Sequence, residues 1–193
     1  MAGKKYEFKP DRTGSGNLGK LYLTKKHRLS LVKWLLYSLV CLVALVLQDV
    51  TMSRLRLFGA TTDLVAVVML MICVLEGGEK GGIFTLICSF IYLFSGSAPG
   101  TYTVVLLTFL GVFAAIFRQA YLRKGYVATL VCTGTALMVY ELATFCVGLL
   151  TGVTIPSRFL SFLLTGLYSS VLMPLLYPVL LSIGKIGGET WKE

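Results

Sequence analysis

The stretch LSLVKWLLYSLVCLVALVL at positions 29–47 decides the class of this protein, because Lys33 is its only charged residue. A helix needs about 20 mainly apolar residues to cross the hydrocarbon core of a membrane, so we expect a transmembrane helix here. In the whole chain, 56% of the 193 residues are hydrophobic and 14% are charged, whereas soluble globular proteins average about 45–50% apolar and about 25% charged residues. This balance excludes a disordered chain and disfavours a soluble domain.

Five further apolar stretches follow, so the sequence predicts an all-α, polytopic membrane helix bundle of about six transmembrane helices. They lie at 57–75, 81–94, 101–117, 126–150 and 159–183. The second and third spans are short, and we favour two tilted spans there over the alternative of a re-entrant hairpin. Outside the bundle at 29–184, we expect a basic, flexible cytoplasmic arm at 1–28 and a short cytoplasmic tail at 185–193.

The distribution of Lys and Arg predicts the orientation of the bundle. Cytoplasmic connections are enriched in these residues, and nine of the eighteen lie within the first 33 positions. With six spans, fifteen of the eighteen lie on the cytoplasmic side and only Arg54, Arg56 and Arg158 lie outside. Both termini are therefore expected in the cytoplasm, and topology explains the net charge of +9 without nucleic acid. The arm is expected to lie near anionic lipid, with a contact to a cytoplasmic partner as the alternative.

Three polar residues in or beside the spans are candidates for partner binding or structure. Glu141 is the deepest carboxylate, and it must face protein or water or be protonated. We favour an interhelical hydrogen bond with a Tyr or Thr, and the alternative is a proton relay or a ligand contact. Gln48 ends the first span, and Asp63 directly precedes the uninterrupted apolar run at 64–75 of the second. We favour a solvated cluster at the outer interface for these two, and the alternative is a partner surface that they form with nearby arginines.

Glycine and proline residues supply the remaining structural candidates. Gly82 belongs to a GxxxG pattern, whose spacing permits close approach of two helices. Gly96 and Gly100 lie in the stretch SGSAPG, which is expected to be a compact outside turn that ends the helices on both sides. Pro174 lies within the sixth span, where it is expected to kink the helix.

The sequence carries no pattern typical of a catalytic, cofactor or metal site. The five cysteines lie within apolar stretches without a CxxC pair, so we expect them to pack as small hydrophobic residues. The single histidine, His27, has no Cys or carboxylate cluster nearby for a zinc site. Walker, HExxH, GxSxG and protein-kinase motifs are absent from the sequence. We therefore expect a protein that is not an enzyme and has no cofactor.

Several segments resemble a known family in their order along the chain. They are Leu47-Gln48 at the end of the first span, the stretch TDLV at 62–65, a glycine-rich joint at 77–82, YLFSGSAPG at 92–100, and SVLMPLL at 170–176, which contains Pro174. This order resembles the MreD family, the small multi-pass membrane proteins of bacterial rod-shape determination. The resemblance covers about residues 30–187, and Tyr92 stands where many members carry Asp.

The resemblance implies a non-enzymatic component of the cell-elongation complex in the bacterial cytoplasmic membrane. Its partner would be an MreC-like bitopic membrane protein, in a complex that connects MreB filaments with RodA and its transpeptidase partner during peptidoglycan synthesis. The fold implied is similar to that of the substrate-binding subunits of energy-coupling-factor vitamin transporters. That similarity supplies the alternative function, a vitamin-binding subunit with a midplane pocket, for which Glu141, Tyr140, Tyr92 and Tyr168 are candidate lining residues.

Overall fold

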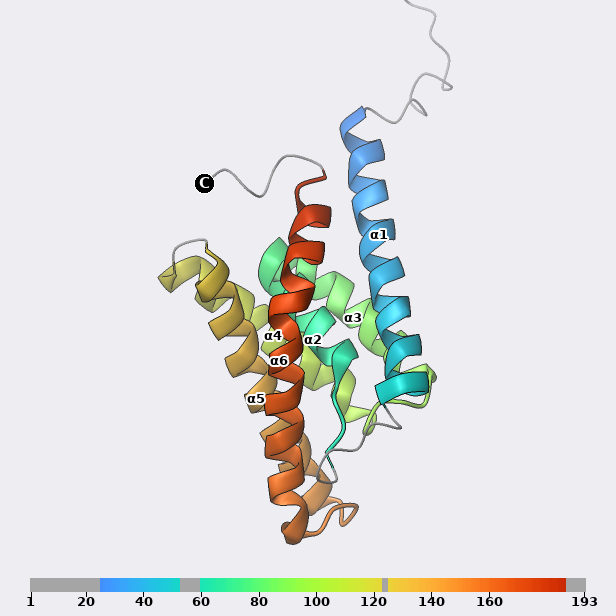
Figure 1. The fold of residues 1–193 in the computed structure, drawn as a ribbon, viewed down its shortest axis with the longest axis vertical. Helices are drawn as coiled ribbons and strands as arrows, with labels where there is room; N and C mark the ends of the chain where they lie inside the picture. The colour runs from blue at the N-terminus through green and yellow to red at the C-terminus, as the bar shows by residue number, and fades with distance from the viewer. Residues whose placement is uncertain (1–24, 53–59, 123–124, 187–193) are drawn as a thin grey trace, which may run out of the picture.

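The computed structural model describes residues 25–52, 60–122 and 125–186, and within them the chain is helical without a strand. Six α-helices alternate in direction, and the start of α1 and the end of α6 lie at the same end of the bundle (Figure 1). We name this the terminal end and the opposite one the distal end. The elements are α1 (Lys25–Leu47), η2 (Gln48–Met52), α2 (Leu64–Glu76), α3 (Gly78–Phe94), α4 (Tyr102–Tyr121), α5 (Tyr126–Leu150), η3 (Pro156–Arg158) and α6 (Phe159–Gly184).

The predicted all-α bundle of six helices is confirmed. α5 coincides with the predicted span at 126–150, and the ends of the other long helices differ from the prediction by at most four residues. Residues 25–28 of the predicted flexible arm already belong to α1, because the basic residues there continue a helix that the apolar stretch supports. The rest of the arm, Arg54, Arg56 and positions 187–193 of the predicted tail lie outside the described residues.

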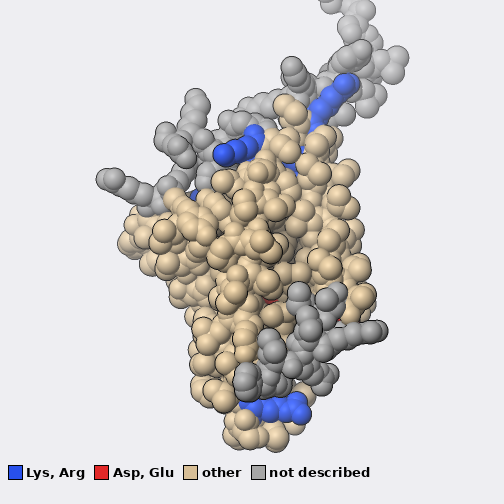
Figure 2. All heavy atoms as spheres, viewed as in Figure 1, with Lys and Arg blue, Asp and Glu red and all other residues tan. Residues whose placement is uncertain are grey.

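Within the part of the chain that the structure describes, four helices are long and apolar enough to cross a membrane, at Arg28–Val50, Tyr102–Tyr121, Tyr126–Leu150 and Pro156–Gly184. Large hydrophobic side chains cover their outer faces; Val105, Phe109 and Val171 are each more than 60% exposed. In Figure 2 the blue Lys and Arg atoms lie towards the ends of the molecule, and the middle of this face is uncharged apart from a small red area in a hollow. An uncharged apolar band of this kind suits a membrane protein.

The two predicted short spans form the short helices of the bundle, but the span predicted at 57–75 begins as α2 only at Leu64, because Asp63 caps the start of the helix. α2 has 13 residues and α3 has 17, which correspond to about 20 Å and about 26 Å of helix. The hydrocarbon core is about 30 Å thick, so neither helix alone matches it. The two alternatives for this pair, tilted spans and a re-entrant hairpin, therefore both stay predictions.

α2 is the centre of the fold. All of its residues from Leu64 to Glu76 are buried, and it contacts α1, α3, α4, α5 and α6 (Figure 1). A helix that is apolar on every side is suited to such a position, because each of its faces meets another helix. It ends at Gly77, whose φ of +96° favours glycine, and the chain then turns directly into α3.

Glycine contacts agree with the close packing that the sequence predicts. A Cβ at Gly82 would lie 2.5 Å from Val112 Cγ2, so α3 and α4 approach closely there. A Cβ at Gly81 would lie 2.7 Å from Cys73 Cα, which brings α3 against the backbone of α2. Gly96 has a φ of +79° in the turn before α4, as expected for a turn glycine.

Two further expectations concern the cysteines and the proline. Cys41, Cys73, Cys88 and Cys132 are buried and Cys146 is exposed, all as free thiols, so four of the five pack as predicted. α6 is one continuous helix with Pro174 inside it, and the kink at this residue stays a prediction.

Candidate functional site

Polar side chains gather at both ends of α2, although the helix between them is apolar. The terminal cluster consists of Lys33, Tyr37 and Glu76, together with the carbonyl oxygen of Leu180. The distal cavity is a hollow at the other end of α2, near Asp63.

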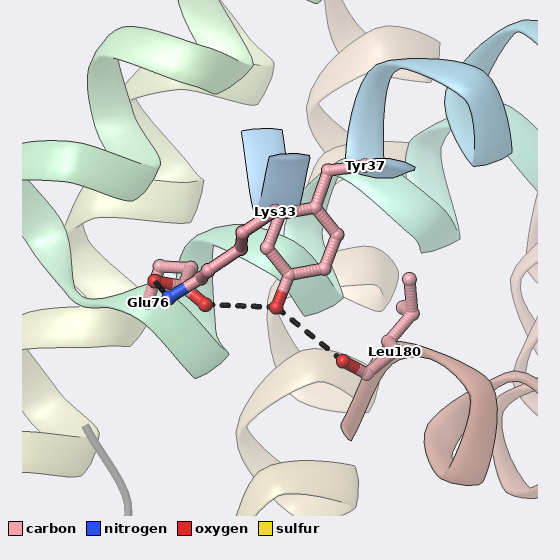
Figure 3. A network of polar contacts seen from close by, with 4 residues as sticks. All are labelled: Lys33, Tyr37, Glu76 and Leu180. Carbon is pink, nitrogen blue, oxygen red and sulfur yellow. Dashed lines mark hydrogen bonds and ion pairs between the residues drawn. The ribbon is translucent and has the colours of Figure 1, made fainter. Parts of the chain in front are cut away.

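The terminal cluster is a buried ion pair with a hydrogen-bonded tyrosine (Figure 3). Lys33 Nζ lies 2.5 Å from Glu76 Oε2, and the Tyr37 hydroxyl donates to Glu76 Oε1 at 2.8 Å. The same hydroxyl is 3.3 Å from the Leu180 carbonyl oxygen. Lys33 and Glu76 are 8% and 7% exposed. Both oxygens of the buried carboxylate therefore have partners, and the contacts join α1, α2 and α6.

Asp63 caps the start of α2 at the distal end. The first N–H groups of a helix have no partner within it, and Ala66 N–H donates to Asp63 Oδ1 at 3.0 Å. The backbone N–H of Asp63 donates to Ser169 Oγ of α6 at 2.8 Å. Asp63 is only 7% exposed, so the favoured interpretation of a solvated outer-interface residue is wrong. The cap interaction holds the Asp63 carboxylate at the end of α2. Because α2 is buried, this carboxylate lies inside the bundle.

Gln48 connects this cap with α3. Its Nε2 donates to the Tyr92 hydroxyl at 3.0 Å, and its Oε1 accepts from Val65 N–H at 2.9 Å. The Tyr92 hydroxyl in turn donates to Asp63 Oδ1 at 3.3 Å. Gln48 is half-buried and belongs to η2, the π-helical turn that extends α1. The prediction that Gln48 is solvated is therefore only partly right, since both ends of its amide bind protein groups.

The distal cavity opens beside this network and has a volume of about 780 Å³. Its wall includes side chains from η2, the segment before α2, the end of α3 and the turn after it, α5, η3 and the start of α6. The lining residues are Gln48, Thr61, Thr62, Asp63, Tyr92, Ser97, Pro99, Glu141, Ser157, Arg158, Leu160, Ser161, Phe162, Leu164 and Thr165.

Glu141 lies in the wall of this cavity and is 4% exposed. Among residues 25–52, 60–122 and 125–186, no side chain or backbone group forms a hydrogen bond or ion pair with its carboxylate. The favoured interhelical hydrogen bond with a neighbouring Tyr or Thr is therefore wrong. Tyr140 lies on a different face of α5 from Glu141, because adjacent helical residues point about 100° apart. Its hydroxyl is buried and does not line the cavity.

The structure brings together some of the predicted site residues and separates others. Gln48, Asp63 and Glu141 all line the distal cavity. Gly96 and Gly100 flank the turn whose Ser97 and Pro99 line the same cavity. Gly82 lies instead in the contact of α3 with α4, and Pro174 lies exposed on α6. For the pocket of the alternative function, Tyr92 lines the cavity as predicted, but Tyr140 and Tyr168 do not.

Sequence reasoning missed the contribution of α6. Ser157, Ser161, Thr165 and Ser169 recur at every fourth position, a spacing that places side chains on one helix face. The first three line the cavity and the fourth accepts from Asp63 N–H. This hydroxyl stripe is the signal that predicts a polar face on an otherwise apolar helix.

A second hollow is the α1–α3 groove, which has a volume of about 520 Å³. Large residues with exposed side chains form its rims, among them Leu42, Ile83 and Ile87. Its remaining lining residues are Trp34, Ser38, Cys41, Leu45, Lys80, Phe84, Cys88 and Ile91. The groove is therefore apolar and lies on the outer surface of the described bundle.

Comparisons with known proteins leave the family undecided. No protein-family model, curated protein or solved structure matches the chain. Among the described residues, no group of three or more His, Cys, Asp or Glu could hold a metal ion. The class that the fold supports is an all-helical bundle with four helices able to cross a membrane.

Proposed function

We propose that this protein is a non-enzymatic membrane component of the bacterial cell-elongation complex, which binds an MreC-like bitopic partner. In this role it helps to couple MreB filaments to peptidoglycan synthesis by RodA and its transpeptidase partner. The observation that carries the proposal is the convergence of residues from three segments that resemble the MreD family.

These segments are far apart in the sequence and meet at one network. Gln48 of the Leu-Gln segment binds Tyr92, and Tyr92 binds Asp63, at 3.0 and 3.3 Å. The network therefore joins segments of the resemblance that lie up to 44 positions apart in the sequence. Tyr92 stands where many family members carry Asp, and its hydroxyl keeps a polar contact between the end of α3 and the start of α2.

The α1–α3 groove is the surface that we assign to the transmembrane helix of the partner. Its lining residues recur at spacings of three, four and seven along both helices, at 34, 38, 41, 42 and 45 on α1 and at 80, 83, 84, 87, 88 and 91 on α3. Each set is one face of a helix. Two such parallel faces form a trough into which the ridge of a third helix packs.

Small residues in the groove suit helix association within a membrane. Ser38, Cys41 and Cys88 lie between the larger residues, and small residues let helix backbones approach closely where lipid is as apolar as the helices. Lys80 lies in the wall at the start of α3. An acidic residue at the corresponding end of the partner helix would complement this charge.

Co-purification of the full chain in mild detergent tests the proposal. An MreC-like protein is expected to co-elute with the wild type, and its yield is expected to fall at least tenfold for Ser38→Trp, which fills the groove. The matched control is Val105→Trp on the outer face of α4, which is 69% exposed and is expected to retain the partner. Absence of an MreC-like protein from the wild-type sample contradicts the proposal, and equal retention by both variants contradicts the assigned groove.

The distal cavity favours the second candidate function, a substrate-binding subunit of an energy-coupling-factor vitamin transporter. Its volume of about 780 Å³ lies within the range of about 300–1,000 Å³ typical of small-molecule sites. A tightly bound vitamin, or co-elution of transporter ATPase subunits in the same purification, would favour this function over the first.

A further inference from the structure

We propose that the distal cavity binds a zwitterionic group, namely an ammonium with a phosphate or carboxylate a few ångströms away. The ammonium lies against Glu141 and Asp63, and the anionic group lies at Arg158 and the start of α6. This inference does not depend on the proposed function, because the groove and the cavity are separate surfaces.

Glu141 is a buried carboxylate in the wall of the distal cavity. It is 96% buried, being 4% exposed, and it lines the cavity without a hydrogen bond or ion pair to any described residue. A buried carboxylate without a partner is costly, and it is stabilised by a donor or a positive charge. When ionised it only accepts hydrogen bonds, and an ammonium supplies donors and a charge of opposite sign.

Asp63 adds a second acidic group to the same wall. Its Oδ1 already accepts from Ala66 N–H and from the Tyr92 hydroxyl at 3.0 and 3.3 Å, so its position is fixed by the fold. Two ionised carboxylates that line one buried cavity repel each other, and a cation between them removes this repulsion. Among the described residues, no Lys or Arg forms an ion pair with either carboxylate.

The opposite charge lies in another part of the same cavity. Arg158 is exposed and lines the cavity wall. It directly precedes α6, a helix of 26 residues whose first residues, Leu160 and Ser161, line the cavity as well. The dipole of a helix favours anions near its start, although the N–H groups of Arg158 and Phe159 already donate to Ile155 and Pro156 of η3. An arginine beside such a helix start is suited to a phosphate or a carboxylate.

The presence of both acidic and basic residues in one cavity favours a zwitterion over a simple ion. A cation alone would compensate the buried acids and leave Arg158 without an anion, and an anion alone would do the reverse. A group with both charges satisfies both parts of the cavity. Phosphoethanolamine has this chemistry, either free or as the headgroup of phosphatidylethanolamine, and the two sources differ in the acyl chains.

The experiment measures the thermal unfolding midpoint of the purified full chain in detergent. The probes are O-phosphoethanolamine, ethanolamine, inorganic phosphate, and mixed micelles with either phosphatidylethanolamine or phosphatidylglycerol. We expect stabilisation by phosphatidylethanolamine but not by phosphatidylglycerol. If O-phosphoethanolamine stabilises as well, the headgroup chemistry suffices and a free ligand is the source; if it does not, the lipid is the source.

Two variants connect the effect with the cavity. Glu141→Gln keeps the shape of the side chain and removes its charge, and Arg158→Gln removes the charge at the start of α6; each is expected to weaken the apparent affinity at least tenfold. Glu79→Gln on exposed Glu79 of α3 is the matched control and is expected to bind as the wild type does.

Three results would overturn the proposal. They are no stabilisation by either form of phosphoethanolamine, equal stabilisation by ethanolamine or phosphate alone, and unchanged affinity in Glu141→Gln. None of them bears on co-purification with an MreC-like protein, so failure here is distinguishable from failure of the proposed function.

Discussion

Buried carboxylates lie near both ends of α2, and they differ in whether they have partners. At the terminal end, Glu76 is paired with Lys33 at 2.5 Å and accepts from Tyr37 at 2.8 Å. At the distal end, Asp63 caps the helix, and Glu141 lines a cavity without a partner among the described residues. One end is a completed structural joint, and the other includes a buried carboxylate without a described partner, where we propose a binding site. The contrast teaches that burial of a carboxylate alone does not indicate a site, whereas burial without a partner does.

The largest loss in the free energy of unfolding is expected from a substitution in the terminal cluster. Lys33→Met leaves Glu76 as an uncompensated buried charge, and loss of one partner of such a pair costs about 3–5 kcal/mol. Equilibrium unfolding in mixed detergent micelles measures the loss, with Lys185→Met on exposed Lys185 as the control. The double variant Lys33→Met with Glu76→Gln is expected to recover part of the stability. A single variant as stable as the control would show that the joint is not formed.

The tyrosine of the same cluster provides the second test. Tyr37→Phe removes the hydroxyl that donates to Glu76 Oε1 at 2.8 Å, and a hydrogen bond to a charged group contributes about 1.5–3 kcal/mol. The same unfolding measurement applies. Tyr121→Phe, at a tyrosine that is 76% exposed, is the control and is expected to change the stability by less than about 0.5 kcal/mol.

The equivalent change at the distal end sharpens the comparison. Tyr92→Phe removes a hydroxyl that accepts from Gln48 and donates to Asp63 at the longer distance of 3.3 Å, and we expect a loss of about 0.5–1.5 kcal/mol. The free energy of unfolding should therefore fall less than in Tyr37→Phe. If Tyr92→Phe costs as much, the distal network is as tightly formed as the terminal one, and the contrast between the two ends is lost.

The smallest effect on stability is expected at Glu141. Glu141→Gln removes no hydrogen bond to a described residue and replaces a costly buried carboxylate by a neutral amide of the same shape, so no fall in the free energy of unfolding is expected. A loss of more than about 1 kcal/mol would instead reveal the interhelical hydrogen bond that the sequence predicts. Measured beside Tyr92→Phe, this variant separates binding capacity from structural support at the distal end.

The helices could be predicted from the sequence because each is a long apolar stretch bounded by charges or turn residues. Which helices pack together could not be predicted, because lipid and the protein interior both select apolar side chains. For example, α2 and α6 are both apolar in sequence, but α2 is buried throughout and α6 is largely exposed. The pairing of Glu76 with Tyr37 spans 39 positions and leaves no periodic signal. The sequence places Asp63 at the interface because arginines precede it, whereas its role as a cap depends on where α2 begins.

The complete enclosure of α2 has a consequence for the biogenesis of the protein. A helix of 13 residues with a carboxylate at each end is too short and too polar at its ends to be held by a bilayer alone. When α2 leaves the ribosome, α1 is already present and can offer Lys33 to Glu76. Ser169 and Leu180, which bind the other polar groups around α2, are synthesised last. The central helix α2 is therefore synthesised early but becomes fully buried only when α6 packs against it.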